Sequence, residues 1–170
     1  METVRVGILT ISDRAARGIY PDESGALLRE RITEQMGWTV AQYVVVPDDR
    51  EAIQQILRSW SDEEGLDLIL TTGGTGLGPR DLTPEATRPL LEREAPGIAE
   101  ALRFYSLQQT PFAMLSRGVA GVRGRTLIIN LPGSPRAVRE AMEILGKVLP
   151  HAIAILRGET GPAAEHFPRA

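Results

Sequence analysis

Residues 67–81 read DLILTTGGTGLGPRD, an apolar run followed by a glycine-rich loop. The run ends in Thr71-Thr72 and predicts a buried β-strand over residues 67–72. Glycines then occupy positions 73, 74, 76 and 78. Glycine permits positive φ angles and lets backbone N–H groups approach a ligand closely. The loop from Gly73 to Asp81 is therefore the strongest candidate for an anion-binding segment.

The alternative explanation of this loop is a tight strand-to-helix turn, but such a turn needs only one or two glycines. It is not a Walker A motif, because no Gly-Lys-Ser/Thr occurs in the chain. It is not a strict G-x-G-x-x-G either, because Pro79 stands where the third glycine after Gly74 and Gly76 belongs. We expect an anion on the loop, with the start of the helix at Thr83-Pro84 adding partial positive charge; Thr83 is the expected N-cap.

Strands and helices alternate on both sides of this segment. Apolar runs predict further strands over residues 4–11, 39–46 and 125–131. Helical spacing of apolar residues predicts helices over 24–36 and 49–61, a helical region over 84–108 interrupted at Pro96-Gly97, and a last helix capped by Ser134. Residues 12–23 are predicted as a loop and 111–121 as mixed structure. The alternation and the apolar strands predict a three-layer α/β/α sandwich with a largely parallel sheet.

Length and composition favour a single domain. At roughly 150 residues per domain, a 170-residue chain predicts one domain over residues 1–157 and a loosely ordered tail over 158–170. We assign the larger aromatic residues to the core or its rim: Trp38, Trp60, Phe104, Tyr105 and Phe112.

Several functional classes are excluded by composition. The chain has no cysteine, and its two histidines, His151 and His166, lack metal-binding spacing, so a zinc site is not expected. A net charge of −3 argues against nucleic acid as a partner. No apolar run approaches a membrane span, and Met1 leads directly into the first strand without a targeting signal, so we expect a cytoplasmic protein.

Ligands of such a sheet bind outside the carboxyl ends of its strands. The four loops expected to meet there are Ser12-Asp13, Pro47-Asp48-Asp49, the glycine-rich loop, and Pro132-Gly133-Ser134. Asp48 and Asp81 beside a phosphate suit a hydrated Mg²⁺. For Asp48, the N-cap of the following helix is an equal alternative. For Asp81 it is weaker, because Thr83 already offers the cap.

Other polar residues of these loops also have two explanations. Arg80 pairs either with a phosphate or with a neighbouring acid. Asp22 and Ser24 either face a polar ligand or belong to a turn, with Ser24 as the cap of the next helix. Ser116-Arg117 lies in an otherwise apolar stretch, which makes it a candidate anion contact.

In combination, these segments resemble the molybdopterin adenylyltransferases, the MogA/MoaB-type family, and the related G domains of gephyrin and the plant molybdenum-insertion protein. The likeness runs from about Val4 to Ile155 and rests on the order and spacing of several motifs: TISD at 10–13, DESG at 22–25, VPDD at 46–49, TTGGTG at 71–76, PRDLTPEA at 79–86, MLSR at 114–117 and LPGSP at 131–135.

The resemblance implies an activity in molybdenum cofactor biosynthesis. Members bind molybdopterin and Mg-ATP and transfer AMP to the terminal phosphate of molybdopterin, releasing pyrophosphate. The family fold is a three-layer α/β sandwich, typically assembled as a homotrimer, and a separate molybdenum insertase receives the product. The alternatives are a non-catalytic molybdopterin-binding or scaffold G domain, and a paralogue without this turnover.

Matching motif by motif, the resemblance implies that Asp48 and Asp81 are the essential acidic pair and the Mg²⁺ ligands. The implied phosphate, nucleotide and molybdopterin contacts are Ser12, Asp13, Asp22, Ser24, Gly25, Thr72, Gly73, Gly74, Thr75, Gly76, Arg80, Ser116, Arg117, Pro132, Gly133 and Ser134. Ser134 departs from the pattern, because many members have Asn or Gln there. The chemistry agrees with a site without a usable histidine or cysteine, since a phosphate nucleophile is already anionic and needs no general base.

Overall fold

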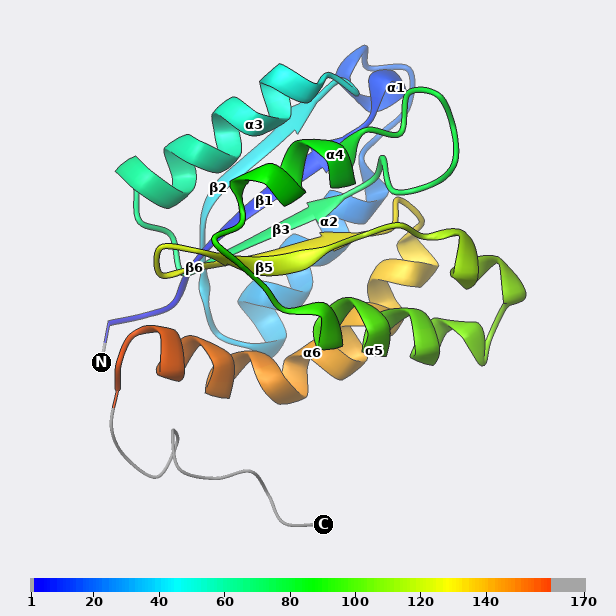
Figure 1. Ribbon diagram of the computed structural model, residues 1–170. Coiled ribbons are helices and arrows are strands. Elements are labelled where there is room, and N and C mark those ends of the chain that lie inside the picture. The colour runs from blue at the N-terminus through cyan, green and yellow to red at the C-terminus, as the bar shows by residue number, and fades with distance from the viewer. Residues whose placement is uncertain (1, 160–170) are drawn as a thin grey trace.

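The computed structural model describes residues 2–159. They form a six-stranded sheet with helices packed around it (Figure 1). Four neighbouring strands pair in parallel, and two further strands join one edge through antiparallel pairings. The strand order is β2 (Thr39–Val46), β1 (Arg5–Ile11), β3 (Leu68–Thr72), β6 (Thr126–Leu131), β5 (Ala120–Arg123) and β4 (Arg93–Glu94). The prediction of a largely parallel sheet is confirmed.

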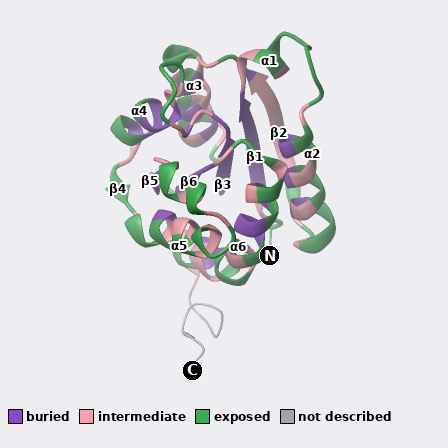
Figure 2. Ribbon diagram, turned by 90° about the vertical axis from the view of Figure 1, so that its right-hand side faces the viewer, coloured by how far each residue is buried: buried purple, intermediate pink, exposed green. Residues whose placement is uncertain are grey.

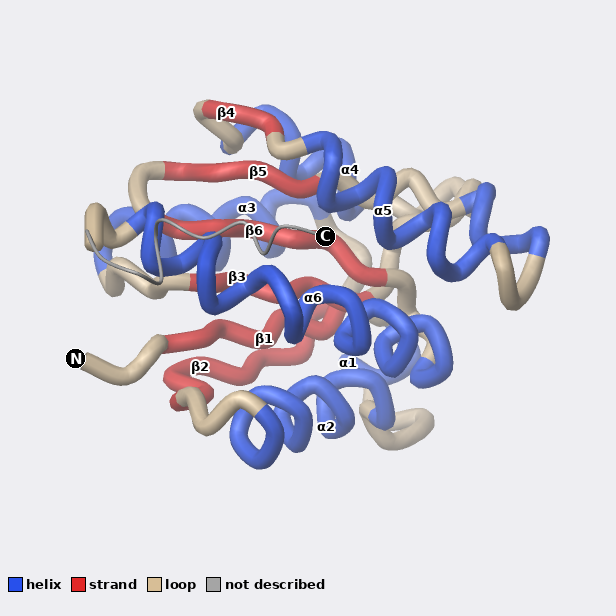
Figure 3. The backbone as a smooth tube through the Cα atoms, turned by 90° about the horizontal axis from the view of Figure 1, so that it is seen from below, coloured by secondary structure: helices blue, strands red, loops and turns tan. Residues whose placement is uncertain are grey.

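Helices cover both faces of the sheet, as expected for three layers (Figures 1 and 3). One face carries α2 (Glu23–Glu30), α5 (Pro96–Leu107) and α6 (Pro135–Leu156); the other carries α3 (Arg50–Arg58) and α4 (Thr83–Thr87). The shorter elements are α1 (Asp13–Ala16), the π-helical turns η1 (Arg31–Gln35) and η2 (Ser59–Glu63), and the 3₁₀ turns η3 (Arg88–Leu90) and η4 (Pro111–Leu115).

Alternate residues of each central strand enter two separate cores. Leu70 of β3 packs with Val138 and Leu145 of α6 on one face. Its neighbour Ile69 packs with Ile53 of α3 on the other. Because both faces are covered, the central strands β1, β3 and β6 are mostly apolar and lie in the buried interior of the molecule (Figure 2).

The structure corrects several predicted boundaries. The region 84–108 is not one interrupted helix: α4 ends at Thr87, β4 follows, and Pro96 occupies the first turn of α5. Proline suits that position because its missing N–H has no helical partner there. Both antiparallel strands escaped prediction, because β4 has two residues and β5 four, too few for a clear alternation. The loop 12–23 also contains the four-residue α1.

The assignment of the aromatic side chains was partly wrong. Trp60 is buried in the α3 core, and Trp38 packs against the opposite core. Phe104 and Phe112, in contrast, are 68% and 76% exposed. Phe104 lies on α5 and Phe112 on η4, both outside the two cores. Their exposure therefore depends on how these elements pack rather than on hydrophobicity.

The end of α6 is tied to the start of the chain. Arg157 forms an ion pair with Asp67 at 2.8 Å and donates to the backbone oxygens of Glu2 and Thr3. Of the predicted tail, only Gly158 and Glu159 are described; the remainder, 160–170, lies outside the described residues. Within residues 2–159, no helix is long and apolar enough to cross a membrane.

Candidate functional site

The four predicted loops do meet at one edge of the sheet. In the parallel registers, Ile11 pairs with Val46, Thr10 with Thr72, and Thr72 with Leu131. The segments that follow β1, β2, β3 and β6 therefore leave the sheet side by side. This edge is where ligands of parallel α/β sheets bind.

Positive φ angles and close packing explain the first two glycines of the loop. Gly73 and Gly74 have φ angles of +102° and +68°. A Cβ on Gly73 would lie 2.2 Å from the Ile11 carbonyl oxygen, and one on Gly74 would lie 2.2 Å from Thr83 Oγ1. The Gly73 N–H donates to the Leu131 carbonyl at 3.0 Å. The loop is thus held against β1 and β6 at its first residue.

Thr83 closes the other end of the loop and is not the N-cap predicted for it. Its hydroxyl donates to the Gly73 carbonyl at 2.9 Å, and its N–H donates to the Gly74 carbonyl at 3.1 Å. Leu82 occupies the cap position of α4, without a side-chain cap. Thr83 therefore fixes the glycine loop in shape.

Arg117 reinforces the same loop from the opposite side. Its Nε donates to the Gly76 carbonyl and its Nη2 to the Asp81 carbonyl, both at 2.7 Å. Its remaining guanidinium nitrogen forms an ion pair with Glu85. The prediction made Arg117 a candidate anion contact; the structure instead commits its donors to loop carbonyls and a carboxylate. Arg117 therefore orders the loop that would hold the anion.

Asp13 and Asp48 bond each other reciprocally across the ends of β1 and β2. The Asp13 N–H donates to Asp48 Oδ2 at 3.0 Å, and the Asp48 N–H donates to Asp13 Oδ1 at 3.0 Å. Arg80 then pairs with Asp13 at 2.6 Å, so the acid is the partner of Arg80. The Arg80 hydrogen bond is the main reason that the pKa of Asp13 falls to about 2.

Asp48 has the opposite pKa shift. Burial raises its pKa, and the negative charges of Asp13 and Asp81 raise it further. The cap explanation for Asp48 is wrong: Asp49 is the N-cap of α3, and its Oδ1 accepts from the Ala52 N–H at 2.8 Å. Asp48 is therefore a partly buried carboxylate whose position capping does not explain.

Asp81 lies at the end of the glycine loop, beside Asp48. Its Oδ2 accepts from the Gly78 N–H at 2.8 Å. The bonds described leave Oδ1 of both Asp48 and Asp81 unused. Mg²⁺ is typically bound through one or two carboxylates, phosphate oxygens and water, so this pair fits the ion's donor preferences. In residues 2–159, no cluster of three or more acidic or histidine side chains offers an all-protein metal cage.

In the DESG segment, Asp22 caps a helix and joins neighbouring elements by hydrogen bonds. Asp22, not Ser24, caps α2: its Oδ1 accepts from the Gly25 N–H at 3.0 Å. Its Oδ2 accepts from Thr10 Oγ1 at 2.7 Å and from the Tyr43 hydroxyl. Burial, together with this bond to Asp22, raises the pKa of Tyr43. Asp22 thus links α2 to β1 and β2.

Three hydroxyl groups at this edge are used to join loops or cap helices. Ser24 Oγ donates to the Gly133 carbonyl at 2.5 Å. Thr72 Oγ1 donates to the Pro132 carbonyl at 2.7 Å, which connects β3 to the loop after β6. Ser134 caps α6 as predicted, accepting from the Ala137 N–H at 3.1 Å.

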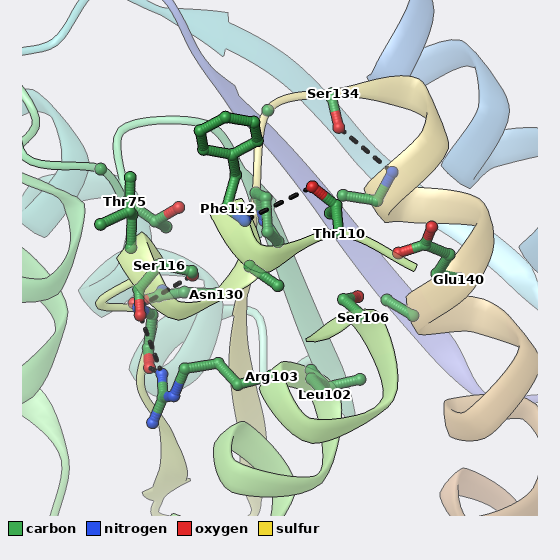
Figure 4. Close-up of a pocket in the computed structure, with 18 of the residues that line it drawn as sticks. Thr75, Leu102, Arg103, Ser106, Thr110, Phe112, Ser116, Asn130, Ser134 and Glu140 are labelled. Carbon is green, nitrogen blue, oxygen red and sulfur yellow. Dashed lines mark hydrogen bonds between the residues drawn. The ribbon is translucent and has the colours of Figure 1, made fainter. Parts of the chain in front are cut away.

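Two cavities open on either side of the glycine loop. The first, about 540 Å³ and here called the polar cavity, is lined by Ser12, Asp22, Ser24, Asp48, Thr72 and Gly73, among others. The second, about 440 Å³ and called the apolar cavity, lies between η4, α5 and α6 (Figure 4). Gly74, Asp81 and Gly133 line both. Of the predicted site residues, Asp13, Gly25, Arg80 and Arg117 line neither.

The walls of the apolar cavity were missed by sequence reasoning. Thr75, Ser116 and Ser134 were predicted and do line it, but Leu102, Arg103, Ser106 and Glu140 were not. Leu102, Arg103 and Ser106 lie on α5 and Glu140 on α6, where helical spacing suggests ordinary surface or core positions. Arg103 donates to the Gly118 carbonyl at 2.8 Å and so holds the segment after Ser116.

Fold and site together define a class: an α/β protein with a glycine-rich loop and two cavities at the carboxyl edge of its parallel strands. Residues 7–151 match the model of a family described as a probable molybdopterin binding domain. The chain belongs to this family of molybdenum cofactor biosynthesis proteins.

Individual relatives agree with the family match. A molybdopterin adenylyltransferase of Helicobacter pylori is 41% identical over 159 residues, covering 93% of this chain and 90% of that protein. The molybdenum cofactor synthesis protein cinnamon of Drosophila melanogaster is 48% identical over 92% of this chain, which spans only 26% of cinnamon. The crystal structure of the molybdopterin biosynthesis enzyme MoaB from Thermus thermophilus is 57% identical, with a TM-score of 0.85 over 91% of this chain and 97% of that one.

Proposed function

We propose that this protein is a molybdopterin adenylyltransferase. It transfers AMP from Mg-ATP to the terminal phosphate of molybdopterin and releases pyrophosphate. The observation that carries the proposal is the pair of cavities that share Gly74, Asp81 and Gly133. A group transfer between two phosphorylated substrates needs two binding sites whose phosphates meet at one point.

The residues at this junction suit that chemistry. A terminal phosphate oxygen of molybdopterin attacks the α-phosphorus of ATP, and the bond from this phosphorus to the bridging oxygen breaks as pyrophosphate leaves. The nucleophile is already anionic near neutral pH, so no residue has to remove a proton. The loop backbone orients the phosphates, with Thr83 and Arg117 keeping the loop in shape.

Asp48 and Asp81 are the residues that would hold Mg²⁺, through their unused carboxylate oxygens. The ion supplies charge neutralisation on phosphate oxygens when bound. Burial and the charges of Asp13 and Asp81 raise the pKa of Asp48, because negative charge is unfavourable there, and a bound cation would offset this charge. The pair therefore serves as the anionic half of an electrostatic site whose cationic half arrives with ATP.

The direct test is release of pyrophosphate from Mg-ATP by the purified protein, with and without molybdopterin. We expect release only when both substrates are present, loss of release in excess EDTA, and recovery with Mg²⁺. Molybdopterin binding without pyrophosphate release would favour a scaffold role instead. Full turnover in excess EDTA would remove the metal from the proposal.

The proposal includes a homotrimer. Large apolar side chains stay exposed on α5 and η4: Phe104 is 68% and Met114 64% exposed, with Leu107 between them in sequence. Exposed apolar side chains grouped in this way favour contact with another protein surface. Sedimentation at micromolar concentration should give three times 18.5 kDa. A monomer under these conditions would contradict the assembly without affecting the proposed reaction.

Residues 1–157 are proposed as the working domain, with 158–170 dispensable for catalysis. A chain truncated after Arg157 keeps the ion pair to Asp67 and should retain turnover. Loss of turnover in a folded truncation would show that the tail contributes.

The adenylylated product would pass to a molybdenum insertase in the cytoplasm, where ATP is supplied.

A further inference from the structure

Glu140 is a buried carboxylate that the reaction chemistry above does not use. It lies on α6, is 8% exposed, and lines the apolar cavity. Its Oε2 atom is buried and has no hydrogen-bond partner in the described structure. Its Oε1 approaches Arg136 Nε at 3.6 Å, too long for a hydrogen bond. An orphaned carboxylate oxygen in a cavity is costly unless a ligand satisfies it.

The surroundings of Glu140 favour a flat, apolar ligand with donor groups. Figure 4 shows Glu140 entering the cavity from α6, facing the side of the cavity that carries Ser106, with Phe112 further along the wall. Leu102, Ala137 and Ala141 supply apolar lining. A carboxylate accepts hydrogen bonds only, so the matching ligand edge must carry N–H or O–H donors.

We propose that Glu140 selects the pterin ring of the substrate by accepting hydrogen bonds from its 2-amino group and N3–H. This inference rests on the proposed function. A pterin presents these two donors side by side, which matches a carboxylate. Adenine presents one amino group beside the acceptor N1, which would face a carboxylate oxygen unfavourably. The same cavity reaches Gly74 and Gly133, where the phosphate of the bound pterin would lie.

The test compares two ligands that differ at one group. The probes are 6-hydroxymethylpterin monophosphate and the corresponding lumazine, which has an oxygen in place of the 2-amino group. Dissociation constants come from ligand fluorescence, without ATP or turnover. Wild type should prefer the pterin, and Glu140→Gln should weaken pterin binding by about 10- to 100-fold, as expected for losing charge-assisted hydrogen bonds. Lumazine binding should change little or improve, because the glutamine amide can donate to the new oxygen.

Two further variants make the result specific. Glu143→Gln lies on the same helix but is exposed and bonded to Tyr105, so both dissociation constants should stay at wild-type values. Glu140→Leu removes the carboxylate altogether and should lose the pterin preference too. Melting temperatures of both Glu140 variants should match or exceed wild type, because each removes a buried charge whose Oε2 has no hydrogen-bond partner and whose ion pair to Arg136 is long.

The outcomes separate this inference from the proposed function. An unchanged pterin-to-lumazine ratio in Glu140→Gln overturns it, as does a wild type without pterin preference. A rise in the KM for ATP with unchanged pterin binding also overturns it, since Glu140 would then face adenine. Pterin selectivity in a wild type that releases no pyrophosphate would contradict the proposed reaction while leaving the role of Glu140 intact.

Discussion

The polar and apolar cavities both border the glycine loop, but their carboxylates differ in whether other residues of the chain satisfy them. In the polar cavity, Asp22 and Asp48 each accept hydrogen bonds from groups on other elements, and Asp48 is bonded to Asp13, which pairs with Arg80. In the apolar cavity, Glu140 keeps one buried oxygen without a partner. The first set of charges is fixed before any ligand arrives, whereas the second is left for a ligand to complete.

This difference separates two ways of building a site. Carboxylates fixed by neighbours cost no reorganisation when a ligand arrives, which suits electrostatic stabilisation of a transition state. A buried acceptor left free gives discrimination, because a ligand without the matching donor leaves it unpaired. The polar side should therefore control the rate, and the apolar side the choice of ring.

The largest expected effect is a loss of turnover when Asp48 or Asp81 is replaced. Asp48→Asn and Asp81→Asn should each lower turnover by about two to three decades, or ~3–4 kcal/mol, comparable to deleting one preorganised electrostatic contact. Asp81→Asn should be the more severe, because Asp81 closes the glycine loop itself. Pyrophosphate release and thermal melting measure the two effects separately, and the melting temperature should hardly move. Wild-type turnover in both variants would refute the role of the pair.

A smaller loss is expected when the loop keeps its residues but loses its support. Arg117→Gln removes the charged donors to the Gly76 and Asp81 carbonyls and should lower kcat by about 10-fold. The matched control is Arg88→Gln, which breaks an exposed ion pair to Glu94 and should leave kcat unchanged. Equal losses in both variants would mean that general destabilisation, not loop order, is responsible.

Two adjacent aspartates should respond oppositely to substitution. Asp49→Ala removes the α3 N-cap and should lower stability by about 1 kcal/mol while turnover per folded molecule stays the same. Asp48→Asn should instead lower turnover per folded molecule and leave stability nearly unchanged. Chemical denaturation together with pyrophosphate release measures both quantities. A loss of turnover in Asp49→Ala at full folding would place Asp49 in the site as well.

The smallest effect is the pH dependence of stability from the bonded pair Asp13 and Asp48. The pKa of Asp13 is lowered from 3.8 to about 2, so its contribution is present above pH 3.8 and lost as the pH falls towards 2. The pKa of Asp48 is raised, so the folded state binds its proton more tightly and stability declines as the pH rises above 3.8. Melting curves against pH should therefore flatten below pH 3.8 in Asp13→Asn, and above it in Asp48→Asn. Parallel curves for wild type and both variants would contradict these shifts.

The sequence predicted the sheet because the relevant signals are local. Runs such as 68–72 and 126–131 are buried on both faces, and their short length favours strands over helices. It missed β4 and β5, which are too short to show a period. It also chose Ser24 and Thr83 as caps where Asp22 and Leu82 hold those positions, because which of several neighbouring residues starts a helix depends on backbone angles.

What the sequence determined by itself is the layered α/β architecture, the edge at which four loops meet, and a glycine loop beside two carboxylates. Only the tertiary structure decided which partner each polar residue at this edge contacts. Arg117 lies 41 positions from Gly76, and Asp13 lies 35 positions from Asp48. Periodicity and capping rules act over a few residues, whereas these contacts form when distant segments are packed against each other. The unpaired Oε2 of Glu140 likewise becomes evident only once α5 and α6 enclose a cavity around it.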